Sequence, residues 1–213
     1  MTFRDRIDAG RRLAAVLGHL GGRADLLVLA LPRGGVPVAA EVARALGAPL
    51  DLCFAHKIGS PSNPEYAIGA VAETGPPYLA EQAIRDLQVP FAYVREEAAL
   101  QQADLVRRAR YYRGSHPAPA INGKCVILVD DGVATGSTAH AALLALRGQR
   151  PSRLVFAAPV AAADSVQALA TEADELAILY APLGFSAVGE FYERFAQVSD
   201  EEVLSVLKDS LKG

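Results

Sequence analysis

The run Val126-Ile127-Leu128-Val129-Asp130-Asp131-Gly132-Val133-Ala134-Thr135-Gly136-Ser137-Thr138 decides the fold prediction for this chain. Its four apolar residues predict a strand that is buried on both faces, as in a parallel sheet. Two carboxylates follow, and a tight turn leads into a helix predicted over 137–146. A strand that ends in acids and passes directly into a helix indicates an α/β protein whose ligand site lies at the carboxyl end of the sheet.

The turn after the strand has the chemistry of a phosphate site. Free backbone N–H groups in the first turn of a helix, together with the helix dipole, attract anions. Gly136 lets a ligand approach the backbone closely. Further hydroxyl donors are Thr135, Ser137 and Thr138. Asp130 and Asp131 are hydrogen-bond acceptors that suit the hydroxyls of a sugar attached to that phosphate. Plain helix capping explains the turn alone, but the complete run favours a sugar-phosphate site.

The rest of the chain alternates apolar strands with helices. Strands are predicted at 26–31, 50–55, 126–129, 154–158 and 176–180. Helices are predicted at 3–20, 36–46, 80–113 with a break at Pro90, 137–146, between the last two strands, and at 199–212. The first helix has an apolar side formed by Ile7, Leu13, Val16, Leu17 and Leu20. This alternation predicts a mainly parallel, doubly wound α/β sheet, and 213 residues fit one domain spanning 1–213.

Two further segments follow predicted strands and carry candidate binding groups. In the run 30–37, Arg33 offers a fork of donors for phosphate oxygens, while Gly34 and Gly35 offer exposed amides. A simple turn is the alternative. The run 56–71 places Lys57 at a strand end, where a solvated lysine is an equally good interpretation. Residues 57–77 are rich in Gly, Pro, Ser and Asn, which predicts a long loop or an irregular hairpin.

The run 126–138 resembles the signature of the type I phosphoribosyltransferases, which has an apolar strand, an acidic pair and then Thr-Gly-small-Thr. The resemblance implies that Asp130 and Asp131 hold the ribose of 5-phosphoribosyl-1-pyrophosphate. It also implies that the loop from Ala134 to Thr138 binds the 5′-phosphate. The segment at Arg33-Gly34-Gly35 resembles the pyrophosphate loop of that family, and Lys57 falls where a mobile loop closes over the site. The order of these segments is similar to that in a poorly characterised branch of predicted phosphoribosyltransferases, over about 26–180.

The resemblance implies an enzyme that moves a phosphoribosyl group to or from a nitrogen base. The implied catalytic residues are Arg33, Lys57, Asp130 and Asp131. Mg²⁺ would arrive with the pyrophosphate donor, without a dedicated protein cage. A small hood from 1–22 and 182–213 would cover a core at 23–181. A non-catalytic binder of the same donor or of a nucleotide stays open, as does an unrelated doubly wound protein for another phosphorylated ligand.

The acceptor base and its proton-handling group are not fixed by the sequence. Ala134 stands where members that act on hypoxanthine commonly carry an Asp, so the resemblance implies poor use of hypoxanthine and guanine. Glu65 and Glu73 are candidate acid–base groups, with ordinary solvated carboxylates as the alternative. The aromatic cluster near the end of the sequence indicates core packing, with a base-stacking wall as the alternative. Its members are Phe185, Phe191, Tyr192 and Phe195.

Composition excludes several other partners. The net charge of −3 gives no general attraction to nucleic acid or to an anionic membrane, and the basic run 107–113 indicates a solvated helix face. The sequence shows neither a signal peptide nor an apolar run of membrane-spanning length. Scattered histidines give no metal-binding spacing. Cys53 and Cys125 lie in apolar runs, which predicts buried free thiols and a reducing, cytoplasmic environment. The oligomeric state stays open, with a homodimer as one option.

Overall fold

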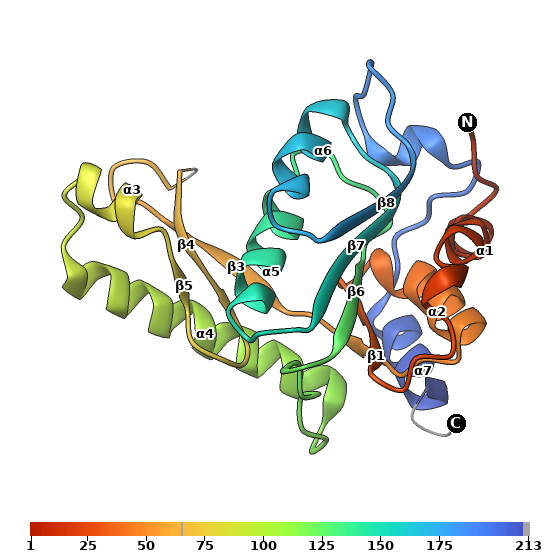
Figure 1. The fold of residues 1–213 in the computed structure, drawn as a ribbon, viewed down its shortest axis with the longest axis horizontal. Coiled ribbons are helices and arrows are strands. Elements are labelled where there is room, and N and C mark those ends of the chain that lie inside the picture. Colours follow the sequence, from red (N-terminus) through yellow and green to blue (C-terminus); the bar gives the residue numbers. More distant parts are fainter. Residues whose placement is uncertain (65, 211–213) are drawn as a thin grey trace.

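The computed structural model describes residues 1–64 and 66–210 (Figure 1). Its elements are α1 (Arg6–Val16), η1 (Gly18–Leu20), β1 (Leu26–Ala30), α2 (Gly35–Leu46), β2 (Leu50–Leu52), β3 (Ala55–Gly59), β4 (Ala67–Ala72), β5 (Tyr78–Leu79), α3 (Glu81–Asp86), α4 (Phe91–Arg113), β6 (Cys125–Val129), α5 (Ser137–Arg147), β7 (Arg153–Val160), α6 (Ala163–Ala170), β8 (Glu175–Tyr180), η2 (Val188–Phe191) and α7 (Asp200–Ser210). The helix predicted at 199–212 begins with a capping box, since Ser199 and Glu202 exchange hydrogen bonds at 2.7 and 3.2 Å. Residues 211 and 212 of that predicted helix lie outside the described residues.

The main sheet is parallel and has the strand order β2-β1-β6-β7-β8. Every residue of β1 and of β6 is buried, which explains why these strands read as unbroken apolar runs. From β1 the chain winds to β2 on one side, whereas the later strands extend from β6 on the other side. The winding direction therefore reverses between β1 and β6, and the carboxyl ends of these two strands mark the place where α/β sheets bind ligands.

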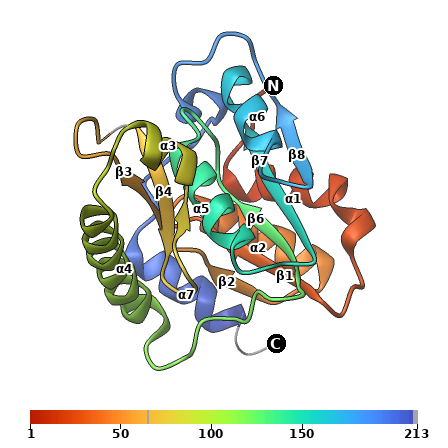
Figure 2. The ribbon, with the colours of Figure 1, turned by 60° about the vertical axis from the view of Figure 1, so that its left-hand side comes forward.

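Alternate residues of the central strands point into two separate hydrophobic layers, one on each face of the sheet. Leu26 and Val28 of β1 face one layer, whereas Leu27 and Leu29 face the other. Helices α1, α2 and α7 pack on the first face, and α5 and α6 pack on the second (Figure 2). The doubly wound arrangement predicted from the sequence is confirmed, because helices cover both faces of the parallel sheet.

A second sheet, antiparallel and with the order β3-β4-β5, forms a lobe with α3 and α4 beside the main sheet (Figure 1). Of the two structures predicted for 57–77, the irregular hairpin is correct, because β3 and β4 pair with a register shift between Ile58 and Gly59. The strand predicted over 50–55 is wrong at its end. β2 stops at Leu52, and Ala55 already pairs with Ala72 in the second sheet.

The first helix is shorter than predicted. It begins at Arg6, because the side chain of Asp5 accepts a hydrogen bond from the backbone of Asp8 and caps the helix there. Ile7 and Val16, expected on its apolar side, are exposed. Phe3 is buried instead and pairs through its backbone with the segment after η2.

The basic run at the end of α4 is not the uniformly solvated face that was predicted, because Arg113 is buried. Its guanidinium donates to the Asp51 carboxylate at 2.5 Å and to the Leu52 carbonyl at 2.6 Å, and it also pairs with Glu73. Glu73 is therefore neither a solvated carboxylate nor a free acid–base group, and Glu65 lies outside the described residues. This cluster joins the end of α4 to β2 and to the residue after β4.

Candidate functional site

A cleft of about 470 Å³ opens at the carboxyl ends of β1 and β6. It is lined by Arg6, Leu31, Pro32, Arg33, Gly34, Asp130, Asp131, Thr138, Phe195, Gln197 and Val198. The cleft brings together predicted site residues from the 32–35 loop, the acidic pair and the start of α5. Sequence reasoning missed the contributions of Arg6 and Gln197, and it had assigned Phe195 to an aromatic cluster with a base-stacking wall as the alternative.

The acidic pair is held rigidly at the end of β6. The backbone N–H of Asp131 donates to Asp130 Oδ1 at 2.9 Å. Oδ2 of Asp131 accepts two contacts from Arg6, from Nε at 2.8 Å and from Nη2 at 2.7 Å. The Tyr192 hydroxyl donates to the Asp131 carbonyl at 2.5 Å. Both the side chain and the backbone of Asp131 are thus fixed by residues from the two ends of the sequence.

Loss of hydration and the adjacent Asp131 carboxylate hold the pKa of Asp130 well above its usual range. The folded state therefore binds a proton more readily than the unfolded chain does. The contribution of Asp130 to stability is most favourable below the ordinary pKa of about 3.9, and it falls as the pH rises from there through the raised folded pKa. At neutral pH Asp130 consequently costs stability.

Asp130→Asn is therefore expected to raise the melting temperature at pH 7, and its advantage should shrink below about pH 4, where Asp130 is protonated in both states. Thermal unfolding between pH 3 and pH 8 measures this. Asp174→Asn is the matched control. Despite some desolvation, hydrogen bonds from Arg147 and from the Leu154 backbone lower the pKa of Asp174, so its loss should destabilise at pH 7. A destabilised Asp130→Asn variant at pH 7 would contradict the assignment.

The 32–35 loop packs directly against the acidic pair. A Cβ at Gly34 would lie 2.1 Å from Asp131 Oδ2, and a Cβ at Gly35 would lie 2.7 Å from the Val129 carbonyl oxygen. Both positions thus need glycine for close approach. The expectation of two exposed amides is wrong for Gly35, which is buried and donates to the Leu31 carbonyl at 3.1 Å. The peptide bond between Pro32 and Arg33 is cis.

Arg33 stands at the wall of the cleft. Its Nη1 lies 3.4 Å from Asp200 Oδ1, which also accepts the Tyr112 hydroxyl at 2.5 Å. The Arg33 side chain is 38% exposed, so its guanidinium remains accessible from the cleft. This placement agrees with a cation that meets an anionic ligand above the acidic pair.

The predicted phosphate loop leads into α5 with the expected geometry. Gly136 has a φ of 74°, a left-handed conformation that favours glycine, immediately before the helix. The buried Ser165 hydroxyl donates to the Ala134 carbonyl at 2.6 Å and holds the loop from behind. Thr138 lines the main cleft, whereas Thr135, Gly136 and Ser137 line an adjoining hollow of about 180 Å³.

Lys57 does not join the other predicted residues in the cleft. It lies on β3 and lines a separate hollow of about 70 Å³ together with Gly69, Ser137 and His140. Arg33 and Lys57, which the resemblance implied as catalytic residues, therefore line different hollows in this arrangement. The physical reason is that β3 belongs to the second sheet, so its end does not share the edge formed by β1 and β6.

The four aromatic side chains near the end of the sequence pack against one another. The rings of Phe185 and Phe191 stack at 5.3 Å, and those of Tyr192 and Phe195 stack at 4.9 Å. The Arg6 guanidinium lies 3.9 Å from the centroid of the Phe195 ring. Internal packing accounts for Tyr192, which is buried, whereas Phe195 is 37% exposed and lines the cleft, so the base-stacking alternative stays open at Phe195.

Within residues 1–64 and 66–210, no group of three or more His, Cys, Asp or Glu side chains is placed to hold a metal ion. The same residues contain no helix that is long and apolar enough to cross a membrane. Cys53 and Cys125 are free and buried, as predicted, and burial raises the pKa of Cys53 to about 12.

Comparisons with known proteins agree with this geometry. The chain is 42% identical over 205 residues to "Putative phosphoribosyl transferase" proteins from two strains of Mycobacterium tuberculosis, CDC 1551 / Oshkosh and H37Rv. The match covers 96% of this chain but 46% of each relative, so the chain spans about half the length of these curated relatives. The crystal structure of TT1426 from Thermus thermophilus is 45% identical, with a TM-score of 0.90 over 98% of this chain and 99% of that one.

The family described as "Phosphoribosyl transferase domain" matches residues 4–177, which includes the strand-and-loop run at 126–138 and the 32–35 loop. The chain therefore belongs to the phosphoribosyl transferase domain family.

Proposed function

We propose that the chain transfers a phosphoribosyl group between 5-phosphoribosyl-1-pyrophosphate and a nitrogen base. The observation that carries the proposal is the single cleft in which Asp130, Asp131, Arg33, Gly34 and Thr138 meet at the winding reversal of the sheet. An acidic pair, a cationic loop and a helix start match, in order, a ribose, a pyrophosphate and a 5′-phosphate.

In the proposed reaction, Asp130 and Asp131 accept hydrogen bonds from the ribose hydroxyls. The N–H groups and hydroxyls of 134–138 hold the 5′-phosphate. The bond between the anomeric carbon and the pyrophosphate oxygen breaks through an oxocarbenium-like state, as in other sugar transfers, and a nitrogen of the base forms the new bond to that carbon. The departing pyrophosphate carries the developing negative charge, and Arg33 stabilises it. Mg²⁺ bound to the donor would add to that neutralisation, and the carboxylate oxygens of the cleft are ligands of the type it accepts.

Lys57 belongs to this reaction only through a movement of the β3–β4 hairpin toward the cleft, because it lines a different hollow. Its placement favours a second candidate function, a protein that binds the donor or a nucleotide without transfer. Turnover of the donor across a panel of purine, pyrimidine and pyridine bases distinguishes the two. Because Ala134 has no acid–base group, we expect hypoxanthine and guanine to be poor acceptors. The buried, free thiols suit a reducing compartment such as the cytoplasm.

Donor binding tests the proposal directly. With Mg²⁺ and the donor at about 100 times its dissociation constant, the free energy of unfolding should rise by roughly 2.7 kcal/mol. The double variant Asp130→Asn, Asp131→Asn should remain folded and lose this gain, because an amide group has one acceptor oxygen where a carboxylate has two. Thermal unfolding with and without donor measures the effect.

The control variant Asp86→Asn, Asp104→Asn removes the same charge from α3 and α4, far from the cleft, and should keep the full gain. A double Asp130, Asp131 variant that is stabilised by the donor as much as the wild type would refute the proposed site.

A further inference from the structure

We propose that Arg6 is a positioning residue of the donor site, which fixes the Asp131 carboxylate so that its second oxygen is directed to the ribose. This inference rests on the proposed function and assigns part of it to the first helix. Arg6 lies 125 residues from Asp131 in the sequence, and it reaches the cleft because α1 packs beside the sheet.

Arg6 is held on every side of its guanidinium. Nε and Nη2 contact Asp131 Oδ2 at 2.8 and 2.7 Å, and Nη1 donates to the Ala196 carbonyl at 2.7 Å. The planar group lies 3.9 Å from the centroid of the Phe195 ring. A planar fork with three simultaneous donors is a geometry that lysine cannot reproduce. The contacts therefore specify arginine and define one orientation of the carboxylate.

The contact is built to persist when a ligand enters. The side chains of Arg6 and Asp131 are 11% and 13% exposed, so separating them would leave two charges largely out of water and unpaired. Departure of Arg6 would also remove the donor to the Ala196 carbonyl. A ligand gains more by using the oxygen that Arg6 does not contact. Both Arg6 contacts end on Oδ2, which leaves Oδ1 for a sugar hydroxyl.

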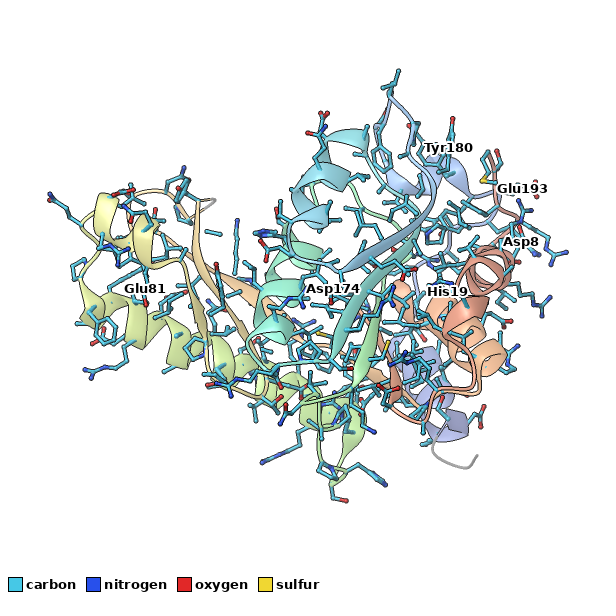
Figure 3. The ribbon with its side chains drawn as sticks, viewed as in Figure 1. Asp8, His19, Glu81, Asp174, Tyr180 and Glu193 are labelled. Atoms are coloured by element: carbon cyan, nitrogen blue, oxygen red, sulfur yellow. The ribbon has the colours of Figure 1, made fainter. Side chains whose placement is uncertain are left out.

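The backbone around Arg6 is anchored to the same region. The N–H of Phe3 donates to the Phe191 carbonyl at 2.8 Å, and the N–H of Glu193 donates back to the Phe3 carbonyl at 2.8 Å. Figure 3 shows Asp8 of α1 and Glu193 on the same side of the molecule. Tyr192, between these contacts, bonds the Asp131 carbonyl. Segments near both ends of the sequence thus support Asp131, the carboxylate that would bind ribose.

The test compares Arg6→Met, Arg6→Lys and the control Arg12→Met. Arg12 lies on the same helix, pairs with Asp8 at 2.8 Å and does not line the cleft. Calorimetry would measure binding of three probes, each with Mg²⁺: the donor, ribose-5-phosphate and inorganic pyrophosphate. Arg6→Met should raise the dissociation constants of the donor and of ribose-5-phosphate roughly 10- to 100-fold, the range for losing a hydrogen bond to a charged group. Binding of pyrophosphate should change less than about twofold, because it does not use Asp131.

Arg6→Lys should recover part of the affinity, and Arg12→Met should behave as the wild type. A second measurement places Arg6→Met in the Asp131→Asn background, where neither buried charge lacks a partner, so folding is preserved. Donor binding should then lose almost nothing further, because Arg6 acts through Asp131. A purely structural role would give the same loss in both backgrounds and an equal loss for pyrophosphate.

The outcomes separate the two proposals. If the wild type binds donor and Arg6→Met binds it equally well or more tightly, Arg6 is not a positioning residue, and a tighter variant would make the contact inhibitory. If the wild type binds neither the donor nor ribose-5-phosphate, the proposed function fails and this inference fails with it.

Discussion

Arg113→Met is expected to lower the free energy of unfolding by about 3–5 kcal/mol, the usual cost of removing one partner from a buried ion pair. The variant would leave the carboxylates of Asp51 and Glu73 and the Leu52 carbonyl without their shared donor. Burial already raises the pKa of Glu73 even with Arg113 beside it. Methionine fills a similar volume, so the loss reports charge and hydrogen bonding more than packing. Urea unfolding at pH 7 measures it.

The matched control is Arg107→Met, on the same helix. Arg107 pairs with Asp104 at the surface, with its side chain 79% exposed, and such pairs contribute less than about 1 kcal/mol. Similar losses in the two variants would show that the buried cluster does not hold α4 to the rest of the protein. Because the cluster joins α4 to β2 and to the end of β4, its loss should also loosen the second sheet before the main one, which hydrogen exchange can resolve residue by residue.

The sequence was most informative where one physical cause dominated. The strands at 26–31 and 126–129 could be predicted because burial on both faces demands apolar residues throughout. The second sheet was harder to predict, because Gly, Pro and Ser dominate 57–77 and the same composition is typical of a loop. Gly69 lies on a strand there, where a Cβ would be 2.5 Å from the Tyr78 carbonyl oxygen. The burial of Arg113 was not predicted for a different reason, since a charged residue in a basic helical run is normally solvated.

The residues of the site also divide into those that the sequence could predict and those that it could not. Arg33 and the acidic pair were predicted to meet because each follows a parallel strand, and the carboxyl ends of parallel strands share an edge. Lys57 follows a strand as well, but β2 ends at Leu52 and the chain has left the main sheet before Lys57. Arg6 gave no local signal at all. Its partners Asp131 and Ala196 are 125 and 190 residues away, and only the packing of α1 brings them together.

Gly34→Ala should reduce kcat/KM for the proposed transfer roughly 100-fold, while leaving the fold intact. Gly34 has a φ of −59°, which alanine adopts without strain, so the effect is purely steric. The added methyl would lie 2.1 Å from Oδ2 and 2.6 Å from Cγ of Asp131. An ordinary contact needs more than 3.4 Å, so the carboxylate must move by more than an ångström from the position in which it would bind ribose. Steady-state kinetics with the best base of the panel, together with thermal unfolding, measure both consequences.

Two glycine variants show what the site, as opposed to the fold, requires. At Gly35 the methyl would meet the Val129 carbonyl at 2.7 Å, and backbone in a central strand cannot yield, so Gly35→Ala should lower stability as well as activity. At Gly184 nothing lies within 4 Å, so Gly184→Ala should leave both unchanged. Gly34→Ala differs from both variants, because the group that its methyl obstructs is the Asp131 side chain. That side chain can rotate out of the way, but it then leaves the position in which it would bind ribose. Wild-type kinetics in Gly34→Ala would mean that the orientation of Asp131 has no bearing on the reaction, and the assignment of Asp131 to the ribose would then fall.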